Sequence, residues 1–270
     1  MDIGTIKTLL RPRDAAEITE WSPSRAWLAG GTWLFSDVQP GTDTLVDLGG
    51  LGWPELEPAA DGLTIGATCH IATLYKFTAP AEWQAASLFR HCCEGFLAGF
   101  KIWNASTVGG NLCMSLPAGP MISLTSALDG VCTLLPRQGA PRTVKVLDFV
   151  TGNNRNVLAP GELLRSIHLP VATLRRRAAM RQVSLTKLGR SGALIIGTAG
   201  PGGDFALTIT AATIRPMRLD FAAMPDAAGL HAAIAGLPED HWFEDVHGSA
   251  AWKRHITPHL AEEIRQELSA

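Results

Sequence analysis

A nine-residue alternation of apolar and polar side chains does most to limit the folds open to this chain. From Leu63 to Ile71 the odd positions are Leu, Ile, Ala, Cys and Ile, and the even positions are Thr, Gly, Thr and His. A period of two is typical of a strand with one buried face. Further along, seven apolar residues recur at steps of three to four, which predicts a helix over about 85–100. Strands and helices therefore occur together.

Further elements follow from propensity, caps and turn residues. Asp14 and Glu17 resemble a capping box, which predicts a short helix over 15–21. Gly200-Pro201-Gly202-Gly203 predicts a turn between two antiparallel strands. A basic, extended stretch between Pro170 and Gln182 is taken as a domain boundary. The remaining predicted strands are 25–28, 44–48, 131–135, 143–146, 162–169, 183–187, 192–198 and 205–213, and helices are predicted over 230–237 and around 260–268.

Composition argues against several classes of protein. The 270 residues leave room for about two domains. The 23 basic and 25 acidic residues nearly balance, without a block of five like charges, which argues against nucleic-acid binding. No uninterrupted apolar stretch approaches ~18 residues, so no membrane span is predicted. Five cysteines, an odd number, favour a reducing compartment, and the N-terminus lacks a signal-peptide pattern, so we expect a cytoplasmic protein.

Two glycine pairs with neighbouring hydroxyl side chains are candidate binding loops. One lies in Ala29-Gly30-Gly31-Thr32 and the other in Thr107-Val108-Gly109-Gly110-Asn111. Glycine lets bare backbone approach a ligand and hydroxyls add donors, so two such loops could hold a pyrophosphate from both sides. Each pair is also consistent with an ordinary tight turn. The chain lacks a G-x-G-x-x-G after a strand and a Walker A motif, so neither a Rossmann fold nor a P-loop is supported.

Cysteine and histidine patterns predict neither a metal site nor a catalytic residue. Cys92 and Cys93 lie in the apolar stripe of the predicted helix, where core packing is expected. C-x-x-C, H-E-x-x-H and G-x-S-x-G motifs are all missing from the sequence. His255 and His259 have the i, i+4 spacing of metal ligands, but no third ligand follows.

Tryptophan is unusually frequent, with eight residues against one tyrosine. Trp33 directly follows the first glycine pair, and Trp103 lies four residues before Thr107. An indole beside a nucleotide site can stack on a planar ring. Both residues can equally be part of the core, which is the commoner role, and the sequence leaves the two alternatives open.

Taken in order, these segments resemble the FAD-binding (medium) subunit of the xanthine dehydrogenase and carbon monoxide dehydrogenase family of molybdenum hydroxylases. The segment at 29–32 resembles that family's A-G-G-T/H loop, and residues 101–112 (KIWNASTVGGNL) are similar to its Q-I-R-N-R-A-T-I-G-G-N-L segment. The resemblance continues through 115–119 (SLPAG), 161–164 (GELL), 186–190 (TKLGR), 214–218 (IRPMR) and 249–255 (SAAWKRH).

The resemblance implies an α+β fold. Residues 1–170 would form a two-subdomain FAD-binding domain of the vanillyl-alcohol-oxidase (PCMH-like) type, with subdomains at about 1–55 and 56–170. Residues 171–270 would form a small C-terminal domain, like that of the carbon monoxide dehydrogenase flavoprotein, with a three-stranded antiparallel sheet and helices. Carried over position by position, the cofactor-binding residues are Ala29, Gly30, Gly31, Thr32, Asn104, Thr107, Gly109, Gly110, Asn111 and Lys187.

The resemblance also implies a role. The chain would be an electron-transfer subunit that passes electrons through FAD to an acceptor such as NAD+, oxygen or a quinone. Its partners would be a small subunit with [2Fe-2S] clusters and a large subunit with molybdopterin. The organic substrate, which would be chosen on another chain, and the subunit stoichiometry are not encoded here.

Four positions depart from the family pattern. Pro120 stands where the family usually has Asp, Trp103 and Ala105 replace two arginines, and Trp33 replaces a common Asp. Each departure loses a polar contact, worth about 1 kcal/mol when buried. They motivate an alternative, a non-catalytic assembly subunit with weakened flavin binding. A free-standing flavin dehydrogenase is a third hypothesis.

Overall fold

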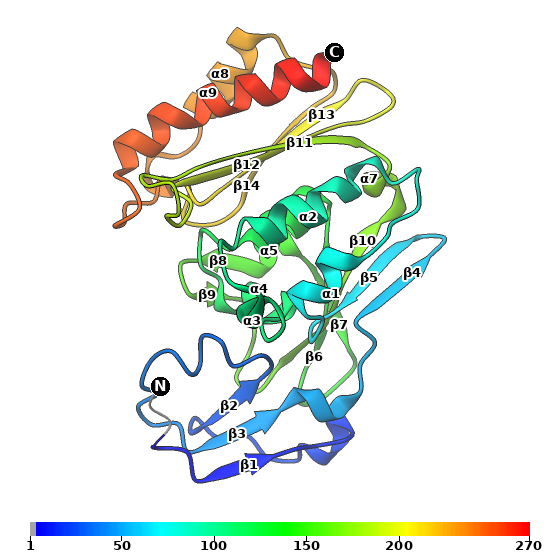
Figure 1. Ribbon diagram of the computed structural model, residues 1–270, viewed down its shortest axis with the longest axis vertical. Helices are drawn as coiled ribbons and strands as arrows, with labels where there is room; N and C mark the ends of the chain where they lie inside the picture. The colour runs from blue at the N-terminus through cyan, green and yellow to red at the C-terminus, as the bar shows by residue number, and fades with distance from the viewer. Residues whose placement is uncertain (1–3) are drawn as a thin grey trace.

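The computed structural model describes residues 4–270, in which three larger sheets follow one another along the long axis of the molecule (Figure 1). The N-terminal sheet is parallel, with β1 (Thr8–Leu10), β3 (Thr44–Asp47) and β2 (Arg25–Leu28) in that order. The helix predicted over 15–21 is only a 3-10 turn, Ala15–Glu17. Asp14 caps it as expected, but Glu17 accepts from the N–H of Arg13 rather than from that of Asp14.

The middle sheet is antiparallel and contains the alternating segment. Its order is β4 (Leu56–Ala59), β5 (Gly62–Gly66), β10 (Leu163–Pro170), β6 (Val131–Leu135) and β7 (Arg142–Lys145). Leu63 and Ile65 are buried, as the period of two predicts. The strand ends at Gly66, earlier than predicted, because the N–H of Cys69 donates back to the Gly66 carbonyl and turns the chain out of the sheet. A small hairpin, β8 (Val150–Gly152) and β9 (Arg155–Asn156), lies apart.

Most of the helices pack between the sheets. The α-helices are α1 (Ile71–Lys76), α2 (Ser87–Glu94), α3 (Phe100–Trp103), α4 (Val108–Met114), α5 (Pro120–Ala127), α6 (Val146–Phe149), α7 (Val171–Leu174), α8 (Ala227–Ala235) and α9 (Ala250–Ser269). Further 3-10 turns are Leu48–Leu51, Gln84–Ala86 and Glu239–His241. Within residues 4–270 no helix combines the length and apolarity needed to cross a membrane.

The helix predicted over 85–100 is shorter than its apolar pattern. Helix α2 ends at Glu94, and Leu97 takes a left-handed conformation with φ of 48°. The stripe is buried through Cys93, whereas Leu97 and Phe100 are exposed, Phe100 to 72%. Beyond the helix end, Phe96 still packs against the core, whereas Leu97 and Phe100 lie on the surface.

The C-terminal sheet has four antiparallel strands, where three were predicted. Its order is β11 (Arg177–Val183), β12 (Ala193–Ala199), β13 (Phe205–Thr210) and β14 (Met217–Phe221). The strand predicted over 183–187 is wrong, since β11 ends at Val183 and the preceding basic stretch forms the strand. Arg181 of this strand pairs with Glu263 and Glu267 of α9, at 2.8 and 2.7 Å, so its charge is neutralised within the fold.

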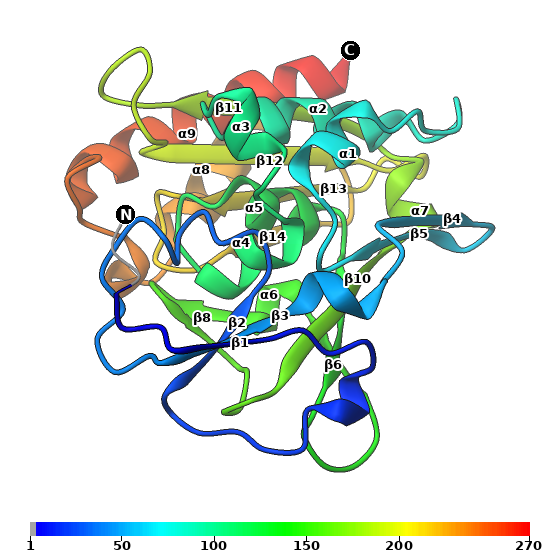
Figure 2. The same cartoon turned by 60° about the horizontal axis from the view of Figure 1, so that its bottom comes forward.

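Helices cover both faces of this sheet. Helices α8 and α9 lie on its outer face, and α2 and α5 lie between it and the rest of the molecule (Figures 1 and 2). All eight residues of α5 are buried. Ser123 of α5 and Thr210 of β13 bring their hydroxyl oxygens to 2.6 Å. The boundary near residue 170 between two domains stays a prediction.

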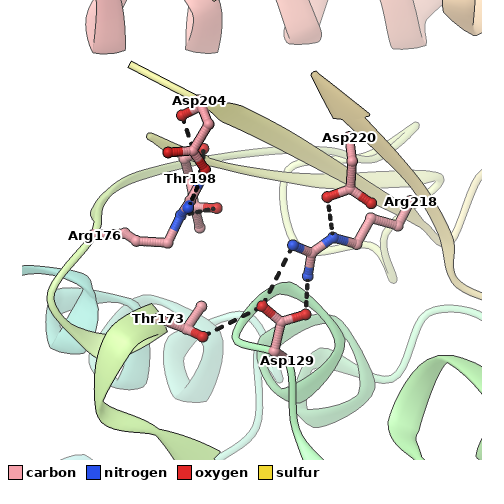
Figure 3. A network of polar contacts seen from close by, with 7 residues as sticks. All are labelled: Asp129, Thr173, Arg176, Thr198, Asp204, Arg218 and Asp220. Carbon is pink, nitrogen blue, oxygen red and sulfur yellow. Dashed lines mark hydrogen bonds and ion pairs between the residues drawn. The ribbon is translucent and has the colours of Figure 1, made fainter. Parts of the chain in front are cut away.

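A polar network joins the C-terminal sheet to the turn after α5 (Figure 3). Asp129 accepts hydrogen bonds from Arg218 of β14 at 2.5 Å and from Thr173 of α7 at 3.3 Å. Arg218 also donates to Asp220 of its own strand at 2.8 Å. A second arginine nearby, Arg176 just before β11, pairs with Asp204 just before β13. The contact between Asp129 and Arg218 therefore ties the edge strand β14 to the turn after α5, in addition to the packing of the sheet's apolar face.

Candidate functional site

A cavity of 420 Å³ lies where the two glycine loops meet the loop between β11 and β12. Figure 2 shows the segment after β2 beside α4, which places the two loops on facing elements. The wall is formed by five stretches of chain: 29–34, 95–98 with Ile102, 106–111, 114–120 and 188–191, though not every residue of each stretch contributes. Segments from the N-terminal, middle and C-terminal parts of the sequence therefore converge on one cavity.

The first loop leaves β2 and turns back at once. Gly31 has a φ of 68°, and the N–H of Phe35 donates to the Gly31 carbonyl at 2.8 Å. A side chain at Gly31 would meet the ring of Phe35, so glycine is required here for space as well as for backbone conformation. The N–H groups of Gly31 and Thr32 donate no hydrogen bond to any described part of the chain. Two free donors are therefore available beside the cavity.

The second loop starts helix α4. Thr107 is extended and caps the helix, with its Oγ1 accepting from the N–H of Gly110 at 3.0 Å. Asn111 lines the cavity, and its Oδ1 accepts from the N–H of Met121 at 3.1 Å, which ties α4 to α5. Gly110 is helical and its φ is not positive, so its small size, rather than a special conformation, suits this position.

The two loops are in direct contact. A Cβ atom on Gly30 would overlap the carbonyl oxygen of Ala105, so only glycine allows the backbones to come this close. Beside this contact, the hydroxyl of Ser106 donates to Oγ1 of Thr32 at 3.1 Å. The contact brings the unpaired donors of the first loop beside the hydroxyls and helix start of the second.

A carboxylate outside the cavity fixes the second loop. His70 pairs with Thr107 as an isolated bridge, and the N–H of the next residue donates to the Ser106 carbonyl at 3.0 Å. Glu55 accepts from the backbone N–H of His70 at 2.8 Å and from Thr73 at 2.7 Å. Burial opposes the charge on Glu55, but these hydrogen bonds outweigh it and hold the pKa of the carboxyl below its ordinary value.

Seven of the ten predicted site residues line the cavity: Ala29, Gly30, Gly31, Thr32, Thr107, Gly110 and Asn111. Three do not. Gly109 is buried against Ala67, Asn104 caps the end of α3 on the surface, and Lys187 is exposed beside the cavity. These placements show which residues lie together, and the binding role of each residue stays a prediction.

Some lining residues were not among the predicted set. Arg190 is the one charged side chain in the wall as far as the chain is described, and it lies three residues after Lys187 in the segment that carried the resemblance. Leu97, Ile102 and Leu188 add exposed apolar surface. The sequence held no signal for Leu97, because its apolar spacing matched a helix that ends before it.

Of the four departures from the family pattern, two reach the cavity. Trp33 and Pro120 line it, and Pro120 occupies the first turn of α5. Trp103 packs against Tyr75, with ring centroids 4.8 Å apart, and its buried Nε1 has no hydrogen-bond partner among the described residues. Ala105 contributes its backbone at the contact with Gly30.

The wall suits a phosphorylated ligand with planar rings. It offers free N–H donors, hydroxyls and one arginine, and no carboxylate belongs to the described wall to repel a phosphate. Apolar residues cover the remainder. Cys113 lies beside the lining residue Met114, and burial raises the pKa of its thiol to about 12, so it is protonated at neutral pH. The residues present therefore fit a dinucleotide such as FAD.

A second cavity, of 630 Å³, lies between α8 and α9 and contains none of the predicted site residues. His231, His255 and His259 line it, and the rings of His255 and His259 have centroids 5.0 Å apart. No group of three or more His, Cys, Asp or Glu residues within 4–270 is arranged to hold a metal ion. The cavity between the glycine loops is the better candidate.

Comparison with known proteins agrees with this geometry. Residues 7–172, more than half of the chain, match the family described as the FAD binding domain in molybdopterin dehydrogenase. Xanthine dehydrogenase of Oryza sativa subsp. japonica is 30% identical over 121 residues, which cover 43% of this chain and 9% of that protein. Xanthine dehydrogenase/oxidase of Gallus gallus is 26% identical over 115 residues, covering 40% and 8%.

Solved structures match over nearly the whole length. CO dehydrogenase from Oligotropha carboxidovorans gives a TM-score of 0.83 at 22% identity, covering 98% of this chain and 99% of that one. Quinoline 2-oxidoreductase from Pseudomonas putida 86 gives 0.79 at 19% identity, covering both chains fully, at 100% each. At these identities the likeness establishes the fold, including the C-terminal sheet and helices that lie beyond residue 172.

Proposed function

Because this chain belongs to the family of FAD-binding domains in molybdopterin dehydrogenases, we propose that it is the electron-transfer subunit of a molybdenum hydroxylase and holds FAD in the cavity between its glycine loops. The observation that carries the proposal is the contact between the loops at Gly30 and Ala105, beside which the N–H groups of Gly31 and Thr32 lack a partner in the described chain. Unpartnered backbone N–H groups beside hydroxyls support the proposal, because they could donate to a pyrophosphate.

Each part of the wall has a distinct task in this proposal. The N–H groups of Gly31 and Thr32 and the hydroxyls of Thr32 and Ser106 would bind the phosphates, and Arg190 would add a positive charge. Asn111, held by Met121, would keep α4 in place beside the ligand. FAD, when bound, supplies the capacity to take up and release electrons, while the protein contributes binding, orientation and electrostatic environment.

The partners that we propose are a small [2Fe-2S] subunit and a large molybdopterin subunit. In the solved structure of a relative, carbon monoxide dehydrogenase from Hydrogenophaga pseudoflava, the enzyme lacks the Mo-pyranopterin moiety of the molybdenum cofactor, which associates that relative with such a cofactor. Exposed large apolar side chains gather around the cavity, namely Leu97, Ile102 and Leu188 in the wall and Phe100 and Leu185 nearby in sequence. Such a surface is typical of a subunit interface. The terminal acceptor, NAD+, oxygen or a quinone, is left open.

We also propose a cytoplasmic location. All five cysteines are free, as expected in a reducing compartment.

The first test is an absorbance spectrum of the purified chain, with chromatography of any cofactor that acid releases. We expect flavin bands near ~450 nm and released FAD. A chain that is colourless as isolated but turns yellow with added FAD has lost its cofactor during purification, and still supports the proposal. A colourless chain that takes up no FAD contradicts it.

The second candidate is an assembly subunit with weakened flavin binding, which Pro120 in the cavity wall favours. It predicts a colourless chain that still assembles with both partners. A free-standing flavin dehydrogenase would instead turn over substrate as a single chain, so dependence on partner subunits excludes it.

A further inference from the structure

Trp33 differs from the other seven tryptophans in its surroundings. It is the most exposed of the tryptophans in residues 4–270, at 37%, and its side chain has no hydrogen bond, ring contact or ion pair with the described residues. Several of the others have aromatic or cationic partners: Trp21 with Trp27, Trp53 with Arg165, Trp83 with Phe77 and Trp103 with Tyr75. A core role therefore does not account for Trp33.

The turn that carries Trp33 fixes it at the cavity. Its carbonyl accepts from the N–H of Ser36 at 2.9 Å and from the Ser36 hydroxyl at 2.7 Å, which holds the backbone in place. The other aromatic residue of the turn, Phe35, packs at Gly31, whereas Trp33 lines the cavity. An indole on a fixed backbone, one residue after Thr32, loses little conformational freedom when a planar group covers it.

We propose that Trp33 stacks on one of the two planar ring systems of the bound dinucleotide and so sets its affinity. This inference rests on the proposed function. Trp33 and Phe96 are the aromatic residues of the described wall, and of the two only Trp33 adjoins the free N–H donors of the first loop. A ring joined through a short linker to phosphates at that loop lies within reach of the indole. Aromatic stacking tolerates many ring chemistries because every such ring has a π-face.

The test compares four proteins: wild type, Trp33→Leu, Trp33→Phe and Trp21→Leu. Leucine keeps an apolar side chain but removes the ring, and phenylalanine keeps a smaller ring. Trp21→Leu removes an indole that lies near Trp33 in the sequence but does not line the cavity. This variant shows how far the loss of a tryptophan affects binding through stability alone. Dissociation constants are measured for FAD, for riboflavin 5′-phosphate and for ADP, together with the fluorescence of the bound flavin.

We expect Trp33→Leu to weaken FAD binding about tenfold, Trp33→Phe to retain most of the affinity, and Trp21→Leu to match wild type. If Trp33→Leu loses affinity for riboflavin 5′-phosphate but not for ADP, and its bound flavin fluoresces more brightly, the isoalloxazine stacks on Trp33. If the variant loses affinity for ADP alone, the adenine stacks there. Unchanged affinity of Trp33→Leu for all three ligands overturns the stack alone. A wild-type chain that binds none of the three overturns the proposed function as well.

Discussion

Gly30 is the residue on which the meeting of the two loops depends. A Cβ atom there would overlap the carbonyl oxygen of Ala105, which belongs to the backbone and cannot rotate away. We predict that Gly30→Ala pushes the loops apart, weakens FAD binding at least tenfold and lowers the free energy of unfolding by about 1–3 kcal/mol. Gly99→Ala is the matched control, since a Cβ at Gly99 meets nothing within 4 Å. Chemical unfolding and FAD titration test both variants, and equal effects of the two would contradict the prediction.

Glu162 couples stability to pH at a single residue. Its carboxylate is 2% exposed and accepts two hydrogen bonds of 2.7 Å from Arg142, with a third of 2.9 Å from the N–H of Ala159. The hydrogen bonds from Arg142 make the largest contribution to holding the pKa of Glu162 below its ordinary 4.5. Burial opposes this shift, and the N–H of Ala159 and the charge of Arg142 add to it. Because the folded pKa is the lower one, the stabilisation is fully present above the unfolded value and is lost as pH falls through the folded pKa.

We therefore predict that Glu162→Gln lowers the free energy of unfolding at neutral pH by about 1–3 kcal/mol. The variant will also lose less stability than wild type when the pH falls below 4.5. Urea unfolding at a series of pH values measures both effects. Parallel pH profiles for the two proteins would show that Glu162 is not a source of the acid sensitivity.

The residues that line the cavity were predictable from the sequence where their role depends on the local backbone. Gly30, Gly31 and Thr32 were found because glycine beside a hydroxyl marks a close approach, and they do line the cavity. Lys187 and Asn104 were predicted from the family resemblance alone, and both are exposed and lie outside the cavity wall. Whether these two residues reach the cavity depends on how α3 and the loop after β11 pack against the rest of the fold. A single sequence carries no information on such long-range contacts.

Among the elements, helix α4 depends on its cap. Oγ1 of Thr107 accepts from the N–H of Gly110 at 3.0 Å at the helix start, beside the cavity. We predict that Thr107→Val, which keeps the shape but loses the acceptor, costs about 1 kcal/mol of stability and weakens FAD binding. Thr107→Ser keeps the oxygen and should remain near wild type in both urea unfolding and FAD titration. If serine and valine behave alike, the hydroxyl is not what starts the helix.

Element prediction succeeded for several strands and failed where tertiary contacts override the pattern. Strands 25–28 and 131–135 were predicted with the bounds that the structure shows. The apolar stripe over 85–100 continues past the real end of α2, because Leu97 and Phe100 fit its spacing although both are exposed, and Leu97 lines the cavity. Strand β11 was missed because its arginines read as a linker, although glutamates of α9, about 80 residues later, pair with Arg181.

For the whole molecule, the ion pair between Asp129 and Arg218 joins β14 to the turn after α5 (Figure 3). Asp129 has a φ of 54°, a conformation that asparagine also tolerates, so Asp129→Asn removes the charge without straining the backbone. We predict a loss of about 1 kcal/mol in thermal or urea unfolding. Asp220→Asn removes the other carboxylate from the same arginine, but Asp220 is 68% exposed, so its loss should be smaller. If Asp220→Asn lost more stability than Asp129→Asn, the ion pair between β14 and the turn after α5 would not be a source of stability.

Helix α5 has a consequence for how the chain must be made. Its eight residues are all buried, and part of their cover comes from β12 and β13, which reach the helix across a sequence separation of 87 residues at Ser123 and Thr210. At ~5–20 residues per second of translation, Ser123 leaves the ribosome roughly 4–17 s before Thr210, its partner in β13. During that interval the mostly apolar surface of α5, interrupted by the hydroxyls of Ser123, Thr125 and Ser126, lacks the cover of β12 and β13, so we expect the nascent chain to be prone to aggregation. The wall of the cavity is complete only when synthesis has passed the loop at 188–191.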